Sequence, residues 1–250
     1  MSSPKINIKP FGVHSVLIEW PNQVSEHILE KILHFETFLK NELLTNQEWE
    51  MVPSYNSLLL INRTAQIDFQ KLSKDIITWY AQLGESTKPD RYLWRLPVNY
   101  DLEYGLDLEE VANKLHKTKE EIIAMHTGAT YTVYGIGFLP GFMYLGGIDK
   151  ELELPRKATP RSKVIKGAVG IAGKQAGIYP QESPGGWNII GNCSVPIFDA
   201  SKENPCFVSV GDKIEFYQIS RAEHNLHKIE AEVGIYKSKS RFLYHGARCR

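Results

Sequence analysis

The spacing of apolar residues in the first part of the chain predicts alternating strands and helices. Between residues 5 and 20, apolar side chains alternate with polar ones, which is typical of half-buried strands. Between residues 24 and 44 they recur every three or four positions, which predicts a helix with one apolar face. Both patterns then repeat. Together they predict strands over 5–9, 15–20, 48–53, 57–61 and 92–98, and helices over 24–44 and 67–83.

The order strand-strand-helix-strand-strand-helix (ββαββα) predicts an α+β domain over residues 1–88, with its helices packed on one sheet. The segment ESTKPD at residues 85–90 is polar and contains a proline, and both features are typical of a linker between domains. We therefore expect a domain boundary in this segment and assign residues 89–250 to a second domain.

Two short helices are predicted after the boundary from capping-box spacings. Asp107 with Glu110, and Thr118 with Glu121, each place an acid three residues after a cap, where the two side chains can satisfy free backbone N–H groups. The second helix ends at His126, just before a glycine-rich segment. A helix C-terminus stabilises an imidazolium by about 0.3–1 kcal/mol. His126 is therefore either such a cap or a group that lines a pocket.

Short apolar runs separated by glycine and proline predict a mainly-β second domain. Twelve of the 19 glycines lie within residues 131–191, and prolines punctuate the chain from there to Pro205. Many short strands joined by tight turns favour a β-barrel or a sandwich. The runs that could form strands are 133–138, 164–165, 168–171, 177–179, 188–191 and 213–217.

Composition and charge exclude several classes of partner. Lys plus Arg and Asp plus Glu balance at 29 each, so no basic excess favours nucleic acid or an anionic membrane. No apolar run approaches the ~20 residues that span a bilayer, and the first residues lack a signal-peptide pattern. Three cysteines are too few for a disulfide framework, so we expect a reduced, cytoplasmic setting.

Common cofactor motifs are missing from the sequence. There is no GxxxxGK(S/T) loop to hold phosphates, and GIGFLPG has the wrong spacing for a dinucleotide-binding turn. The patterns HExxH and CxxC are also absent, and so is an Asp-rich calcium loop. We therefore expect neither a metal held by the protein nor a tightly bound cofactor.

A cluster of donors and aromatic side chains within the glycine-rich segment predicts a binding pocket. Arg161 offers a planar fork that suits a carboxylate, and the amides of Gly185 and Gly186 are unshielded by side chains and can receive an oxyanion. The other candidates for this pocket are Phe138, Phe142, Gln175, Tyr179, Ser183 and Trp187. Three of the candidate residues also have a purely structural interpretation: Arg161 as a surface charge, Ser183 as a turn residue and Trp187 as part of the core. The expected ligand is a small carboxylate or amide.

Two runs in this region resemble a known family. They are GFLPGFMYLGGIDKELELPRKATPR (137–161) and GAVGIAGKQAGIYPQESPGGWNIIG (167–191). Both closely resemble the B subunit of 5-oxoprolinase and allophanate hydrolase subunit 1, a family that includes a sporulation-kinase inhibitor and the carboxyltransferase-type domain of urea carboxylase. The resemblance is dense over residues 95–217 and looser over IKPFGVHSVLIEW (8–20). Departures occur at Lys174 and Ala176, where the family commonly has Asn and Thr, and at Asn192-Cys193-Ser194, which replace a more basic run after Gly191.

The resemblance implies a cyclophilin-like β-barrel after the smaller α+β domain. It also implies an ATP-dependent subunit that opens 5-oxo-L-proline to L-glutamate, together with a homologous second subunit and a third subunit. ATP, with Mg²⁺, is then a co-substrate of the assembly, and the chain is expected to be inactive alone. In this hypothesis Arg161 holds the substrate carboxylate, Gly185 and Gly186 face the oxyanion, and His126 and Gln175 orient substrate or water.

Other functions fit the same residues. The chain could be a regulatory protein that binds and inhibits a sporulation-type histidine kinase, since a pocket can bind a ligand in a regulator as well as in an enzyme. It could also be a subunit of an enzyme that hydrolyses allophanate or another urea-derived amide. Prolyl isomerase activity follows from analogy of fold alone, which is a weak argument for function.

Overall fold

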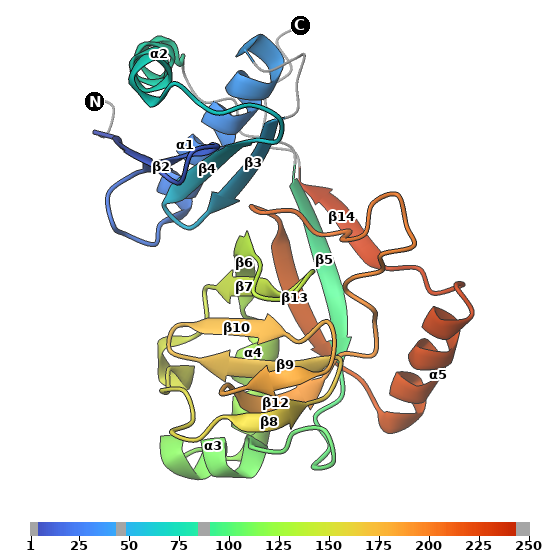
Figure 1. The fold of residues 1–250 in the computed structure, drawn as a ribbon. Helices are drawn as coiled ribbons and strands as arrows, with labels where there is room; N and C mark the ends of the chain where they lie inside the picture. Colours follow the sequence, from blue (N-terminus) through green and yellow to red (C-terminus); the bar gives the residue numbers. More distant parts are fainter. Residues whose placement is uncertain (1–4, 44–48, 85–90, 244–250) are drawn as a thin grey trace, which may run out of the picture. The chain divides into compact units, whose positions relative to one another are not determined.

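The computed structural model describes residues 5–43, 49–84 and 91–243 (Figure 1). The chain divides into two compact units, whose described parts lie within residues 5–84 and within residues 91–243. The boundary expected at residues 85–90 falls outside the described residues, so its position stays a prediction. Each unit is described by itself below.

The first unit is a four-stranded antiparallel sheet with two helices. Its elements follow the order that the periodicity predicts, and the strand order across the sheet is β1-β2-β4-β3. A single π-helical turn, η1 (Leu39–Leu43), extends the first helix. The elements are β1 (Asn7–Pro10), β2 (Ser15–Glu19), α1 (Glu26–Phe38), β3 (Trp49–Ser54), β4 (Ser57–Asn62) and α2 (Phe69–Gln82).

Aromatic side chains join the helices of this unit to its sheet. Trp20 follows β2, and its indole N–H donates to the Tyr80 hydroxyl of α2 over 3.0 Å. Phe35 of α1 meets Tyr80 edge to face, with ring centres 5.1 Å apart. An indole N–H buried without an acceptor would be costly, so this bond lets Trp20 enter the core. Asp68 caps α2 by accepting from the Lys71 amide.

The second unit contains a mixed eight-stranded sheet, a two-stranded ladder and three helices (Figure 1). The large sheet has the order β12-β9-β10-β7-β6-β13-β5-β14, and its one parallel pair is β13 with β5. The small ladder pairs β8 with β11. The helices are α3 (Leu108–Leu115), α4 (Lys119–Gly128) and α5 (Arg221–Glu232), and a 3₁₀ turn, η2, covers Lys150–Leu152.

The strands of this unit are short, as the glycine and proline spacing predicts. Three of them, β7, β11 and β14, were not expected from the sequence. The bounds are β5 (Arg91–Val98), β6 (Thr130–Ile136), β7 (Met143–Gly146), β8 (Arg161–Val164), β9 (Ala168–Ala172), β10 (Gln175–Ile178), β11 (Ser183–Gly185), β12 (Asn188–Asn192), β13 (Lys213–Gln218) and β14 (Lys239–Leu243).

The two predicted capping boxes have different outcomes. Thr118 and Glu121 form the reciprocal pair of hydrogen bonds at the start of α4. Asp107 stands at the N-cap position of α3, but its side chain makes no capping bond, so that prediction is wrong. The reason is that other donors engage its carboxylate, as shown below. α3 packs on β12 and α4 packs on β13, which brings Asp107 beside the sheet.

Two apolar clusters fill the second unit. The larger one lies between α3, α4 and the sheet and includes Tyr131, Met143, Ile190 and Phe216. The smaller one is built around Phe142, Tyr179 and Trp187. Among the described helices, none combines the length and hydropathy needed to cross a bilayer.

Candidate functional site

Arg161 and the Ser183–Gly186 segment are neighbours, as the sequence hypothesis requires. β8 and β11 pair so that Gly185 lies opposite Arg161, and Ser183 lies opposite Val164. The Lys157 amide donates to the Gly186 carbonyl over 2.8 Å and extends this contact. Loops that are far apart in the sequence are thereby held together by backbone hydrogen bonds.

The fork of Arg161 is already engaged by a carboxylate of the same chain. Its Nη1 donates to Asp107 Oδ2 over 2.8 Å, and its Nη2 donates to Oδ1 over 2.6 Å. Lys157 Nζ also donates to Asp107 Oδ1 over 2.8 Å, and the Ile189 amide donates to Oδ2 over 2.7 Å. Asp107 is 1% exposed, so it is a buried acceptor for donors from three residues.

The charges of this cluster balance. Burial alone would raise the pKa of Asp107, but hydrogen bonds from Arg161, Lys157 and the Ile189 amide outweigh it, and the pKa lies below the ordinary value. Lys157 also reaches Glu110, over 2.8 Å. Two carboxylates therefore meet two cations, and the cluster stays ionised at neutral pH. We call Asp107, Glu110, Lys157 and Arg161 the Asp107 cluster.

An aromatic group packs beside this ladder. The Phe142 ring stands edge to face with the rings of Tyr179 and Trp187, with centres 5.3 and 5.4 Å away. Trp187 fits because Gly170 and Gly177 lack side chains: a Cβ there would come within 3.0 and 3.1 Å of its atoms. All three aromatic residues are buried, so they form a core that supports the ladder.

Phe138 is the member of the predicted aromatic set that faces solvent. It is 68% exposed and has φ of 66°, which is rare for a residue with a side chain. Its ring meets Phe142 edge to face, with centres 5.9 Å apart. Phe138 is thus available to a ligand or a partner, whereas Phe142 is not.

Ser183, Gly185 and Gln175 have specific local positions. The Ser183 hydroxyl donates to the Pro184 carbonyl over 3.1 Å. Gly185 is required because an added Cβ would lie 2.3 Å from the Tyr179 hydroxyl. Gln175 begins β10, where it pairs with Ala172 and Gly146 in the large sheet. This pairing gives Gln175 a place in the sheet, and its predicted catalytic role stays a prediction.

His126 lies inside the larger core. It is completely buried, its Nδ1 is 2.7 Å from the Tyr100 hydroxyl, and its ring stacks on Phe216 with centres 4.5 Å apart. Burial lowers its pKa to about 3, so the ring is neutral. The expectation that His126 lines a pocket is therefore wrong, and the structure does not bring it to Arg161. Its predicted catalytic role stays a prediction.

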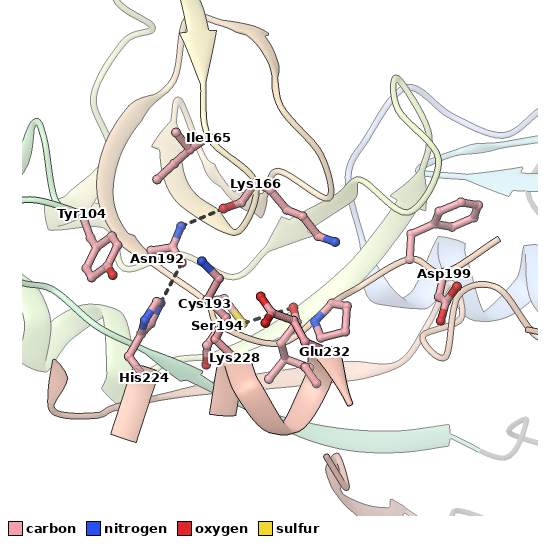
Figure 2. A pocket seen from close by; sticks show the side chains of 14 residues that line it. Tyr104, Ile165, Lys166, Asn192, Cys193, Ser194, Asp199, His224, Lys228 and Glu232 are labelled. Carbon is pink, nitrogen blue, oxygen red and sulfur yellow. Dashed lines mark hydrogen bonds between the residues drawn. The ribbon is translucent and has the colours of Figure 1, made fainter. Parts of the chain in front are cut away.

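A cavity of about 620 Å³ opens between the end of β12, the segment that follows it, and α5 (Figure 2). Figure 2 shows Asn192 between Lys166 and His224, with a hydrogen bond to each. The cavity is lined by Tyr104, Ile165, Lys166, Asn192, Cys193, Ser194, Val195, Pro196, Phe198, Asp199, His224, Lys228, Ala231 and Glu232.

The sequence hypothesis missed both this cavity and the role of Asp107. Asp107 has the spacing of a helix cap, and its partners Lys157 and Arg161 lie 50 and 54 positions away. The cavity is lined by the end of β12, the segment after it and α5, and none of the candidate residues from the sequence lies in its wall. The one available signal was the departure from the family pattern at Asn192-Cys193-Ser194, since these three residues lie in its wall.

Comparisons with known proteins define the class of protein. Residues 6–208 match the family model described as carboxyltransferase domain, subdomain C and D. The urea carboxylase of Kluyveromyces lactis has a similar fold, with a TM-score of 0.79 and 19% identity. That alignment covers 96% of this chain and 24% of the other. The sheet-rich architecture is thus that of a carboxyltransferase domain.

Two curated relatives are similar over nearly their whole lengths. The B subunit of 5-oxoprolinase from Bacillus subtilis is 31% identical over 91% of this chain and 98% of its own. The B subunit of 5-oxoprolinase from Haemophilus influenzae is 37% identical over 84% and 97%. The chain therefore belongs to the carboxyltransferase-domain family that includes this 5-oxoprolinase component.

Proposed function

We propose that this chain is a subunit of an ATP-dependent 5-oxoprolinase, which opens 5-oxo-L-proline to L-glutamate. The observation that carries the proposal is the similarity to the B subunits of 5-oxoprolinase from two bacteria, which spans at least 97% of each relative. A shared domain of a longer enzyme would match only part of a relative. Here the alignment spans nearly the whole of each relative, which favours a shared role as well as a shared fold.

The reaction needs activation because a five-membered lactam is a stable amide. In the proposed assembly ATP, with Mg²⁺, supplies that activation as a co-substrate. Within residues 5–43, 49–84 and 91–243, no three His, Cys, Asp or Glu side chains gather as a metal site. The sequence also lacks a phosphate-binding loop. These two observations identify no phosphate loop in the sequence and no metal cluster among the described residues, so we derive no step through ATP.

The proposal includes partners. The two bacterial relatives are each named as one component of an enzyme with several subunits. We therefore propose a homologous second subunit and a third, with this chain inactive alone. We also propose that residues 91–243 form a cyclophilin-like barrel and that the complex is cytoplasmic. Exposed Phe138, on its constrained turn, is a candidate contact for a neighbouring subunit.

The predicted substrate site at Arg161, Gly185 and Gly186 has to accommodate the contact that Asp107 makes with Arg161. Its parts are adjacent, which supports it. However, Asp107 occupies the Nη1–Nη2 edge of the Arg161 guanidinium, so a substrate carboxylate has to use the other N–H groups of Arg161 or displace Asp107. Arg161→Ala in the assembled enzyme tests this role. An unchanged KM for 5-oxoproline would remove Arg161 from the substrate site.

Co-purification with the neighbouring gene products tests the function and its alternatives. We expect a stable complex whose ATP hydrolysis rises when 5-oxoproline is added. ATP hydrolysis that responds to allophanate or another urea-derived amide would instead indicate an amide hydrolase of that class. A chain that forms no such complex but blocks autophosphorylation of a sporulation-type histidine kinase would be a regulator, and the proposal would be wrong.

A further inference from the structure

The exposed side of α5 carries an apolar stripe. Figure 1 shows this helix at the periphery of the second unit. Leu226, Ile229 and Val233 are 54%, 58% and 64% exposed, and Ala222, one turn before Leu226, is exposed as well. Steps of four, three and four residues align the four side chains on one face of a helix. Exposed apolar residues are ordinary when they are scattered, but an aligned set on one face marks a contact surface.

The opposite side of α5 contacts the rest of its unit mainly through polar side chains. His224 is buried, its Nε2 lies 2.8 Å from Asn192 Oδ1, and its ring packs on Tyr104 with centres 4.5 Å apart. The His227 ring meets the Tyr236 ring edge to face, with centres 5.3 Å apart. An ordinary surface helix turns its apolar side inward and its polar side to solvent. α5 has the reverse arrangement, so packing within the described chain does not account for its apolar side.

Hydrogen bonds at its N-terminus keep α5 formed without help from the stripe. The Ser220 hydroxyl accepts from the Glu223 amide over 3.3 Å, and the Glu223 carboxylate accepts from the Ser220 amide over 2.8 Å, as a capping box. A binding partner therefore meets a stripe that is already ordered, which lowers the entropy cost of binding.

The spacing of the stripe is that of a coiled-coil seam. The steps of four, three and four residues place Ala222, Leu226, Ile229 and Val233 at positions d, a, d and a of a heptad repeat. Position f, on the far side of the helix from the seam, then falls on His224, which is buried in its own chain. The seam is ~17 Å long at about 1.5 Å per residue, so it suits one partner helix that lies along α5 for about three turns.

Acidic side chains border the seam. Glu223 and Glu230 occupy its e side, and Glu232 occupies its g side together with the neutral Asn225. Within the described parts of the chain, none of the three carboxylates has a salt-bridge partner. Acids at the e and g positions favour a partner with Lys or Arg beside its own apolar face.

The two cations of α5, Arg221 and Lys228, lie farther from the seam, at position c. Arg221 donates to Glu103 over 3.0 Å, and Lys228 lines the cavity of Figure 2. The e and g edges of the seam therefore carry only negative charge.

The charge pattern decides between the possible occupants of the stripe. In an antiparallel pair of α5 helices, Glu223 would face Glu230 of the second copy, and in a parallel pair Glu230 would face Asn225. A second copy thus offers these acids no cation. The three carboxylates would also be repelled by an anionic membrane. A protein helix with basic flanks satisfies both the seam and its edges.

We propose that α5 is a docking helix for a partner subunit, which lays along it an amphipathic helix with apolar residues at a and d spacing and Lys or Arg on both flanks. The choice of a subunit as the protein that carries this helix rests on the proposed function. The apolar stripe, which no described part of the chain covers, is then buried in the assembly, and the three carboxylates at its edges gain cations.

Two synthetic peptides of three heptads probe this surface on the full-length chain. Both carry Leu at a and d, and their e and g positions are all Lys in one peptide and all Glu in the other. Fluorescence anisotropy should show saturable binding of the Lys peptide, and binding of the Glu peptide that is about tenfold weaker or more. Leu226→Ser should weaken binding of the Lys peptide by about tenfold, because it removes an apolar side chain from the middle of the seam.

Ile77→Ser is the matched control, because Ile77 is a similarly exposed apolar residue of another helix, α2. It should bind the Lys peptide as the wild type does. Both variants change an exposed side chain, so urea unfolding should give the stability of the wild type for each. Absence of binding, equal affinity of the wild type and Leu226→Ser for the Lys peptide, or equal affinity of the wild type for the two peptides would overturn the proposal.

Charge exchange and self-association test the choice of occupant. Glu230→Lys combined with Glu232→Lys should reverse the preference, so that the Glu peptide binds more tightly than the Lys peptide. Sedimentation velocity of the chain alone should give the same mass for the wild type and Leu226→Ser. A wild-type dimer that Leu226→Ser converts to a monomer would show that a second copy occupies the stripe, and the proposal would be wrong.

Cross-linking in the assembled complex identifies the occupant. The chain carries a photo-reactive benzoylphenylalanine in place of Leu226 and is reconstituted with its neighbouring gene products. We expect a cross-link to a helix of a partner subunit that has basic residues beside its apolar face. Cross-links confined to copies of this chain, or no cross-link at all, would overturn the proposal.

The same complex separates this proposal from the proposed function. If it converts 5-oxoproline to glutamate but position 226 gives no cross-link to a partner subunit, the function holds and the docking surface is wrong. If position 226 gives that cross-link but no glutamate forms, the docking surface holds and the enzymatic function fails.

Discussion

Asp107 and Arg161 form a two-point ion pair, with Nη1 to Oδ2 at 2.8 Å and Nη2 to Oδ1 at 2.6 Å. The pair joins the start of α3 to β8, and the Ile189 amide ties the same carboxylate to β12. One buried carboxylate therefore connects three segments that are distant in the sequence. It holds the side chain of Arg161, whose backbone pairs with Gly185 in the β8–β11 ladder, and so ties the candidate site to the stability of the fold.

We expect Asp107→Asn to lower the free energy of unfolding by about 3 kcal/mol, because it leaves the cations of Arg161 and Lys157 without their buried counter-charge. Urea unfolding measures the difference. Glu110→Gln is the control, since Glu110 is exposed and its loss should change stability by less than about 1 kcal/mol. Equal effects of the two changes would contradict the central position of Asp107.

The Asp107 effect should also depend on pH. Its pKa is depressed in the folded chain, so its stabilisation is fully present above the ordinary value of 3.8 and is lost as pH falls through the folded pKa. The gap in stability between the wild type and Asp107→Asn should therefore shrink in strong acid. A gap that grows as pH falls would contradict the sign of the shift.

His126 should make the protein sensitive to mild acid. Its pKa is about 3 in the folded chain against 6.5 for an ordinary histidine, so the unfolded chain gains a proton first as pH falls below 6.5. Stability from this group is complete above 6.5 and should decline by up to about 1.4 kcal/mol per pH unit below it. His126→Phe should give a flatter curve of unfolding free energy between about pH 6 and 4.5.

The control for this curve is His27→Gln, because His27 is exposed on α1. It should leave the slope as it is in the wild type. The comparison between variants is needed because burial also lowers the pKa of His34 and His224, which contribute to the same range. Parallel curves for the wild type and His126→Phe would show that His126 titrates normally.

Gly185 should not tolerate a side chain. An added Cβ would lie 2.3 Å from the Tyr179 hydroxyl and 2.8 Å from its ring, and Tyr179 is 1% exposed and packed against Phe142, so it cannot swing aside. We expect Gly185→Ala to destabilise the fold by about 1–3 kcal/mol. Gly137→Ala, where nothing lies within 4 Å of the new Cβ, should be nearly neutral in thermal unfolding. A melting temperature of Gly185→Ala equal to that of the wild type would contradict the close contact with Tyr179.

The sequence predicted the elements whose signals are local. The order of strands and helices over residues 5–84 followed from apolar spacing, and Thr118 with Glu121 formed the expected cap. By contrast, β11 has the sequence SPG, which carries no apolar alternation. Its pairing with β8 is a tertiary contact, so no window of the sequence could have revealed it.

Only part of the candidate site could be predicted from the sequence, because the rest of it depends on tertiary contacts. Gly185 and Arg161 are neighbours, as expected, because the glycine-rich loops fold back on each other. The engagement of Arg161 by Asp107 depends on a contact 54 positions away, and the neutral, buried state of His126 depends on Tyr100 and Phe216. Residue types indicated which groups could bind a small acid, but only the packing decides which of them are available.

The most direct test of the account follows isotope-labelled 5-oxo-L-proline through the complex reconstituted with its neighbouring gene products and ATP. The account predicts labelled glutamate when this chain, its partner subunits and ATP are all present. It predicts none when this chain is omitted or when it is supplied alone. Undiminished glutamate formation without this chain would contradict its assignment to the 5-oxoprolinase complex.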